Sequence, residues 1–128
     1  MRDIELEMKI QKSLNEGNNV WVVGDVHGFN QTLRSLVAKL EIKTGDYVVL
    51  LGDLIDRGPD SYDVIQFVKT SPNMATVKGN HEKMMAKVFS LSRLEKPDLR
   101  ISTWFYNGGL STATSYINAY TDSNGNEN

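Results

Sequence analysis

Three short polar motifs in this chain combine carboxylate, imidazole and amide side chains. They read GDVHG at residues 24–28, GDLIDRG at 52–58 and GNHE at 79–82. Oxygen and nitrogen ligands of this kind suit manganese, iron or zinc better than soft copper. The chain contains no cysteine, which excludes thiolate ligands, disulfides and a cysteine nucleophile. The residue types therefore predict a centre for divalent metal ions.

The first motif places Asp25 and His27 two residues apart. On an extended segment leaving a strand, side chains at this spacing point to the same side. The glycines in the motifs let the backbone turn sharply and approach a bound group closely. A single Asp-x-His after a strand is usually a turn capped by the aspartate. The occurrence of three such motifs in one chain favours the metal interpretation.

Each motif follows a short apolar run that predicts a buried strand. The runs cover residues 19–23, 47–51 and 74–77. Continuous apolar runs are typical of parallel strands covered on both faces. The carboxyl ends of parallel strands meet at one edge of a sheet, where α/β proteins bind ligands. We therefore expect the three motifs to converge on one crevice.

Apolar residues at helical spacing predict a helix after each strand. The first helix has its apolar face within residues 33–40, with Asn30 as the candidate cap. The second has its apolar face within residues 64–68, with Asp60 or Ser61 as the cap. A third helix is predicted around residues 84–89. The fold class is therefore α/β, built on a β-α-β-α-β unit.

The remaining C-terminal residues are less regular. Residues 94–100, which include Pro97, predict a loop. The aromatic residues 104–106 are interpreted as packing, and Asn107-Gly108-Gly109 as a helix stop, with a place in the cleft wall as the alternative. A last helix is predicted from Ser111 to about Tyr120, followed by a disordered tail at 121–128. Residues 1–128 are interpreted as a single, partial domain.

Charge and hydrophobicity exclude several kinds of partner. The formal net charge is -2 and the pI is near 5.6, so no basic excess predicts binding to nucleic acid or to an anionic membrane. The N-terminal residues lack the pattern of a signal peptide, and no segment approaches the roughly 20 apolar residues that a membrane span needs. We expect a cytoplasmic protein.

The three motifs, in this order and at this spacing, resemble those of the calcineurin-like metallophosphoesterases. The Asp-Arg-Gly within the second motif narrows the resemblance to the phosphoprotein phosphatase branch. The compact spacing and the later WFYNGG stretch are similar to the small bacterial and bacteriophage lambda-type Ser/Thr protein phosphatases. The resemblance covers about Val20 to Tyr116 and corresponds to the amino-terminal half of such an enzyme. It implies half of an α/β/β/α sandwich, truncated at the C-terminus.

The resemblance also implies a role for each motif residue. Asp25 and His27 would bind the first metal, and Asp53 would bridge both metals. Asn80 would bind the second metal and contact phosphate. The family mechanism is direct attack on phosphorus by a hydroxide that bridges two divalent metals, here expected to be manganese, with iron or zinc as alternatives.

Three further residues receive roles or alternatives. The resemblance makes His81 the general acid, Asp56 its orienting carboxylate and Arg57 a ligand of phosphate oxygens. A surface ion pair is the alternative interpretation of Asp56 and Arg57. Glu82 is interpreted as a first-turn helix acid rather than a metal ligand.

The chain departs from the family pattern in its histidines. Family members supply two more histidines to the second metal from their carboxyl-terminal half, whereas this chain has only His27 and His81. We therefore expect one metal to be retained and an uncovered sheet face to favour self-association. The expected substrate is a phosphoprotein or another phosphoester. Hydrolysis of dinucleoside polyphosphates and a truncated, non-catalytic fragment are the alternatives.

Overall fold

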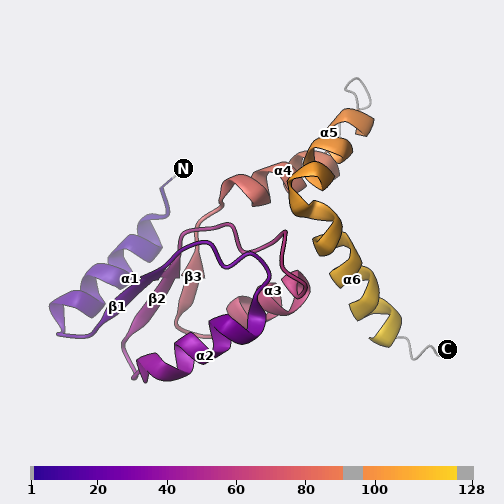
Figure 1. The fold of residues 1–128 in the computed structure, drawn as a ribbon. Coiled ribbons are helices and arrows are strands. Elements are labelled where there is room, and N and C mark those ends of the chain that lie inside the picture. The colour runs from indigo at the N-terminus through magenta and orange to yellow at the C-terminus, as the bar shows by residue number, and fades with distance from the viewer. Residues whose placement is uncertain (1, 91–96, 124–128) are drawn as a thin grey trace.

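The centre of the molecule is a three-stranded parallel sheet. The computed structural model describes residues 2–90 and 97–123. Strands β1 (Val20–Val23), β2 (Tyr47–Leu50) and β3 (Met74–Thr76) pair in the order β1-β2-β3 (Figure 1). Both pairings are parallel. The predicted α/β class and the β-α-β-α-β order are confirmed.

Helices α2 (Asn30–Leu40) and α3 (Ser61–Thr70) connect the strands and lie side by side below the sheet in Figure 1. Their apolar faces bury Leu33, Val64 and Val68 against the strands. The buried cluster comprises Val26, Leu33, Val48, Leu50, Leu54, Ile55, Val64 and Val68. The predicted cap of α2 is wrong, because Asn30 is already the first helical residue and Phe29 precedes it. Asp60 does precede α3, but its side chain makes no capping hydrogen bond.

The sheet is not covered equally on its two faces. Val22, in the middle of β1, is 61% exposed, so the expectation of strands covered on both faces is wrong there. Leu51 and Val77, just beyond β2 and β3, are also exposed. These apolar side chains agree with the predicted uncovered face.

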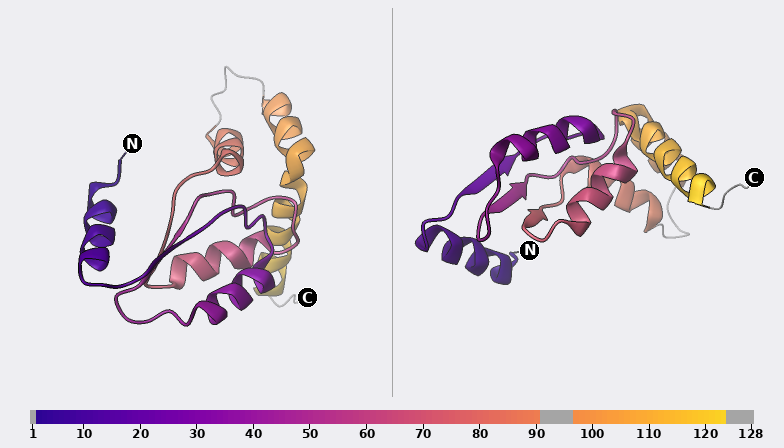
Figure 2. Two further views of the ribbon diagram at one scale, coloured as in Figure 1. Left: turned by 60° about the vertical axis from the view of Figure 1, so that its left-hand side comes forward. Right: turned by 90° about the horizontal axis from the view of Figure 1, so that it is seen from below.

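An N-terminal helix, α1 (Ile4–Asn15), precedes the sheet and has no counterpart in the sequence prediction. Asp3 caps it by accepting the backbone N–H of Leu6 at 2.9 Å. Ser13 is the buried residue of the helix, and its hydroxyl donates to the carbonyl of Gly45. Figure 2 shows α1 at the opposite end of the molecule from the C-terminal helices.

The C-terminal part is helical: α4 (Asn80–Phe89), α5 (Pro97–Trp104), a single π turn η1 (Phe105–Gly109) and α6 (Leu110–Ser123). The loop predicted over 94–100 is wrong for 97–100. Pro97 opens the helix, because the first helical position needs no backbone N–H. Residues 94–96 lie outside the described part of the chain.

The Asn-Gly-Gly sequence interrupts the helical geometry between α5 and α6, in agreement with the predicted helix stop. Asn107 and Gly108 leave helical geometry, with φ of -91° and 102°, and α6 starts two residues later. Helix α6 then continues to Ser123, which places residues 121–123 of the predicted tail in a helix. Residues 124–128 lie outside the described part. None of the helices within the described residues is long and apolar enough to cross a membrane.

Candidate metal centre

Asp25, His27 and Asp53 meet at the carboxyl-terminal edge of the sheet. One ligand atom from each lies within 4.8 Å of the others, close enough to hold a single ion. Two of the three come from the loop after β1 and the third from the loop after β2. Two carboxylates and an imidazole form a donor set that suits a first-row divalent metal. The residues present therefore fit the predicted ion.

The orientation of His27 strengthens this fit. Its ring is buried, and Nδ1 lies 2.8 Å from the carbonyl oxygen of Ile55. A carbonyl only accepts, so Nδ1 carries the proton and Nε2 keeps its lone pair. Histidines that bind metals are commonly fixed in this way, by a hydrogen bond from the other ring nitrogen.

The backbone of these loops is left-handed at the predicted site residues. Among the described residues, six non-glycine residues have a positive φ, and five are site candidates: Asp25, His27, Asp53, Asp56 and Arg57. Each such conformation costs on the order of 1 kcal/mol or more, and the surrounding contacts must hold it. The extended segment predicted for Asp25 and His27 is therefore wrong, although their ligand atoms do converge.

Glu82 joins the second and third loops. Its carboxylate accepts backbone N–H groups from Asp53 at 2.6 Å, from Leu54 at 2.8 Å and from Gly79 at 2.9 Å. A fourth, longer bond comes from Ile55 at 3.3 Å. Sequence reasoning correctly placed this residue in the first turn of α4 but missed its contacts with the second loop. Its spacing three residues after Gly79, typical of a capping glutamate, was the available signal.

We call these hydrogen bonds of the Glu82 carboxylate the Glu82 clamp. Beside it, the backbones of the second and third loops approach each other closely. A Cβ placed on Gly79 would lie 2.4 Å from both the backbone nitrogen and Oδ1 of Asp53, so a side chain cannot fit there. The backbone N–H of His81 donates to Asp53 Oδ1 at 3.0 Å. One oxygen of the predicted bridging carboxylate is thus fixed by the first turn of α4.

His81 and Asp56 form a buried pair beside the three predicted ligands. Nδ1 of His81 lies 2.7 Å from Oδ2 of Asp56, which confirms the predicted proximity. The Asp56 carboxylate is fully buried and also accepts bonds from Trp104 and Thr112. This burial excludes the alternative of a surface ion pair between Asp56 and Arg57.

Asn80 and Arg57 flank this pair. Asn80 is the first residue of α4, is exposed, and directly precedes His81. Arg57 is also exposed, and its backbone N–H donates to the carbonyl of Gly108 at 3.0 Å. Both side chains are therefore accessible to a ligand at this edge of the sheet.

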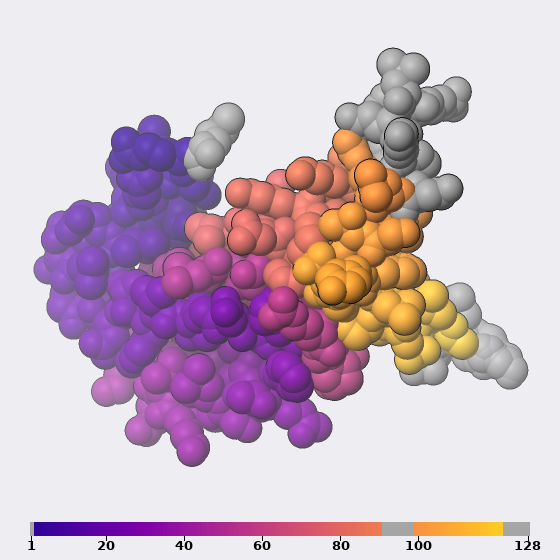
Figure 3. All heavy atoms as spheres, turned by 45° about the horizontal axis from the view of Figure 1, so that its top comes forward, coloured from indigo at the N-terminus to yellow at the C-terminus, as the bar shows by residue number. Residues whose placement is uncertain are grey.

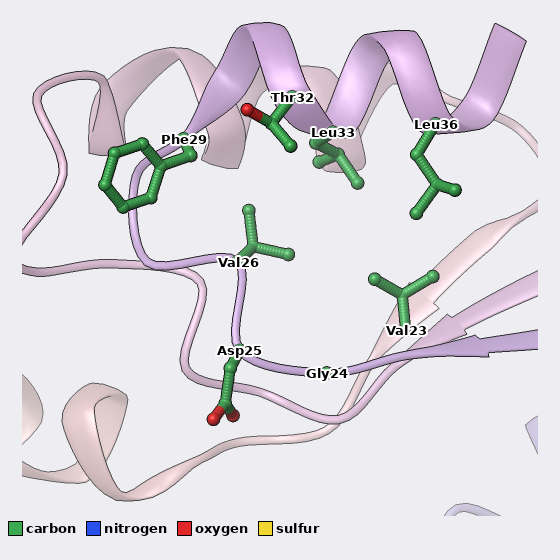
Figure 4. A pocket seen from close by; sticks show the side chains of 8 residues that line it. All are labelled: Val23, Gly24, Asp25, Val26, Phe29, Thr32, Leu33 and Leu36. Atoms are coloured by element: carbon green, nitrogen blue, oxygen red, sulfur yellow. The ribbon is translucent and has the colours of Figure 1, made fainter.

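A separate hollow of about 200 Å³ adjoins the first loop. Figure 4 shows Val26, Leu33 and Leu36 pointing into it, while the carboxylate of Asp25 points away. Its lining is mostly apolar. The hollow therefore belongs to the packing of α2 and not to the predicted metal centre.

The parallel sheet, the converging strand ends and the carboxylate and imidazole cluster define an α/β protein with a candidate metal site. The family model for calcineurin-like phosphoesterases matches residues 19–126. The chain therefore belongs to the calcineurin-like phosphoesterase family.

Curated relatives carry two kinds of name. Serine/threonine-protein phosphatase 1 of Salmonella typhimurium is 38% identical over 112 residues, which are 85% of this chain and 46% of that protein. Serine/threonine-protein phosphatase 2 of Escherichia coli K12 is 43% identical over 72 residues, 56% of this chain and 33% of the relative. The symmetrical bis(5'-nucleosyl)-tetraphosphatase of Escherichia coli O139:H28 is 38% identical over 84 residues, 64% and 30% of the two chains.

A solved structure with the second kind of name is also similar to this chain. A crystal structure described as a "putative diadenosine tetraphosphatase" matches with a TM-score of 0.50 and 33% identity, over 66% of this chain and 40% of that chain. The chain spans less than half of the length of each of these relatives. The predicted family resemblance is confirmed, whereas the relatives' names leave two substrate classes open.

Proposed function

We propose that this chain carries the metal-binding and proton-donating part of a phosphoester hydrolase of the Ser/Thr protein phosphatase type. The observation that carries the proposal is the His81–Asp56 pair beside the cluster of Asp25, His27 and Asp53. The rings of His27 and His81 are in edge contact, with centroids 4.7 Å apart. A predicted proton donor thus lies next to the predicted metal ligands.

The residues divide into those that hold metal and those that handle the phosphoester. Asp25, His27 and Asp53 would hold one divalent ion, and Asp53 with Asn80 would contribute to a second. Bound divalent ions, manganese in our proposal, would supply positive charge that polarises the phosphoester and acidifies water.

His81, Asp56 and Arg57, which lie beside these residues, would transfer the proton and bind phosphate. With Nδ1 of His81 bonded to Asp56, Nε2 is the nitrogen that remains to donate a proton to the leaving oxygen. Asp56 keeps the ring oriented through this hydrogen bond. The planar guanidinium of Arg57 is suited to bind two phosphate oxygens at once.

Hydrolysis of a dinucleoside tetraphosphate is the second candidate. It is supported by relatives named for that activity, at an identity similar to that of the phosphatases. The motifs that the structure brings together serve phosphorus chemistry in general and do not choose between a phosphopeptide and a dinucleotide.

The proposal is tested with the purified 128-residue chain and manganese. Hydrolysis of a phosphoserine or phosphothreonine peptide is compared with hydrolysis of bis(5'-adenosyl) tetraphosphate. We expect slow, metal-dependent turnover with a higher kcat/KM for the phosphopeptide. This turnover is lost in His81→Asn and retained in Asp63→Asn, a change at an exposed carboxylate on α3.

Two other results would change the proposal. A higher kcat/KM for the dinucleotide would support the second candidate, a dinucleoside tetraphosphate hydrolase, in place of a protein phosphatase. Manganese binding without turnover of either substrate would leave a non-catalytic fragment.

A further inference from the structure

The C-terminal helical segment, residues 97–123, contacts two adjacent residues of the second motif. Trp104 and Thr112 bind the carboxylate of Asp56, and Gly108 binds the backbone of Arg57. These contacts join residues about 50 positions apart in the sequence. In the proposed function, Asp56 orients the proton donor His81 and Arg57 binds phosphate.

The hydrogen bonds to Asp56 fix both of its carboxylate oxygens. Trp104 Nε1 lies 3.0 Å from Oδ1 and 2.9 Å from Oδ2, and the Thr112 hydroxyl donates to Oδ1 at 2.6 Å. The Thr112 oxygen also accepts the backbone N–H of Asp56 at 2.8 Å. A fully buried carboxylate is stable only with donors of this kind. The carboxylate is therefore held in the orientation in which Oδ2 faces His81.

The kink between α5 and α6 holds the backbone of Arg57, the residue after Asp56. Gly108 has φ of 102°, and its carbonyl accepts the backbone N–H of Arg57 at 3.0 Å. A Cβ on Gly108 would lie 2.7 Å from Cγ of Arg57. The kink therefore needs glycine both for its backbone conformation and for its contact with the start of the arginine side chain.

The same segment is anchored to the rest of the fold. Helix α5 packs on α4 and helix α6 packs on α3. The Ser115 hydroxyl oxygen accepts the backbone N–H of Tyr62 at 2.9 Å, and the rings of Tyr62 and Tyr116 are in edge contact. Figure 3 shows the orange atoms of α5 lying against the salmon atoms of α4. Because the segment is anchored in this way, its hydrogen bonds can hold Asp56 and Arg57 in fixed positions.

We propose that Trp104, Gly108 and Thr112 are positioning residues that orient Asp56 and Arg57 toward a bound phosphate group. The proposal rests on the proposed function. It goes beyond that function by giving a task to residues outside the three motifs. None of the three is a predicted metal ligand, so their loss should affect phosphate binding and not metal binding.

The test uses the full chain and two variants that remove one hydrogen-bonding group each, Thr112→Val and Trp104→Phe. Thr112→Ser restores the hydroxyl, and Tyr106→Ala is the matched control, because Tyr106 lies in the same kink and is 91% exposed. Three quantities are measured: amide hydrogen exchange of Asp56 and Arg57 by NMR, manganese affinity by calorimetry, and orthophosphate affinity with manganese present.

We expect Thr112→Val to speed exchange at both amides and to weaken orthophosphate binding by about tenfold, the effect of losing one hydrogen bond to a charged group. Manganese affinity should stay near that of the wild type, whereas the thermal midpoint should fall because a buried hydrogen-bond partner of Asp56 is lost. Thr112→Ser should restore both quantities, and Tyr106→Ala should change neither. If Trp104→Phe does not fold, the pair of Thr112 variants decides.

Two results would overturn the proposal. One is unchanged exchange and orthophosphate affinity in folded Thr112→Val. The other is a parallel loss of manganese affinity, orthophosphate affinity and stability, which indicates a merely structural role. Failure of the wild type to bind manganese and orthophosphate would instead overturn the proposed function, while the exchange data still report whether these residues hold Asp56 and Arg57.

Discussion

His81 Nδ1 lies 2.7 Å from Oδ2 of Asp56, although the two residues are 25 positions apart and come from the first turn of α4 and the loop after β2. Both side chains are buried, and the His81 ring meets that of His27 edge-on at 80°. This geometry uses one nitrogen of His81 for the carboxylate and leaves the other for a ligand. His81 and the neighbouring proposed metal ligands therefore have different proposed tasks, which can be tested separately.

Replacing His81 by asparagine should lower the maximal rate far more than it weakens manganese binding. The reason is that the ring is proposed to donate a proton, and general acid catalysis is commonly worth about 100-fold or more. The maximal rate with a chromogenic phosphomonoester and the manganese affinity by calorimetry are measured on the same preparation. An equal loss of both would make His81 a metal ligand.

The chain should bind one manganese ion weakly, at Asp25, His27 and Asp53. These three residues supply ligands for one ion, whereas a second ion would have only Asp53 and Asn80 from the proposed set. Asp53→Asn should abolish binding measured by calorimetry, and Asp63→Asn should leave it unchanged. Two equally tight sites with rapid turnover would contradict this prediction.

Glu82→Gln should weaken manganese binding by about tenfold, the loss typical of residues that orient a metal ligand. The amide retains one accepting oxygen but turns an NH2 group toward backbone N–H donors of Asp53, Leu54 and Gly79. Calorimetric titration with manganese measures the effect. Glu16→Gln, at an exposed carboxylate after α1, is the control. Equal affinity in the two variants would show that the clamp does not position Asp53.

Leu50→Ala and Leu51→Ala should differ sharply in their free energy of unfolding. Leu50 is fully buried in the central strand, and its truncation should cost about 2–5 kcal/mol because it leaves a cavity. Leu51, the next residue, is 54% exposed and should cost much less. Urea unfolding followed by circular dichroism compares them. Similar losses would show that the uncovered face is buried in solution.

Acid should destabilise the turn before β2 through Asp46. Backbone N–H groups of Asn19 and Lys43 bond its carboxylate and hold the pKa of Asp46 below its ordinary value. A lowered folded-state pKa stabilises the fold above the unfolded pKa, and this contribution disappears as pH falls through the folded value. Asp46→Asn should therefore reduce stability at neutral pH and flatten its fall in acid, as measured by thermal unfolding between neutral and acidic pH. An unchanged pH profile would contradict this assignment.

The sequence by itself determined the three strands and the helix that follows each of them, α2, α3 and α4. It also determined the sheet edge at which the motifs lie. Local periodicity carries this information, because apolar runs ending at glycine leave few alternatives for a parallel α/β unit. The motif residues Asp25, His27, Asp53, Asp56 and His81 could be named because their spacing resembles a known family. Their roles in metal binding and proton transfer remain proposals.

Only the tertiary structure decided how those residues are held. The left-handed backbone at Asp25 and His27, the Glu82 clamp and the bonds from Trp104 and Thr112 to Asp56 all depend on contacts between distant segments. A periodicity signal reports only which face of an element is apolar. Whether a polar side chain on that element meets a carboxylate some 50 residues earlier is fixed by the packing of α5 and α6 on the sheet unit, which local sequence does not encode.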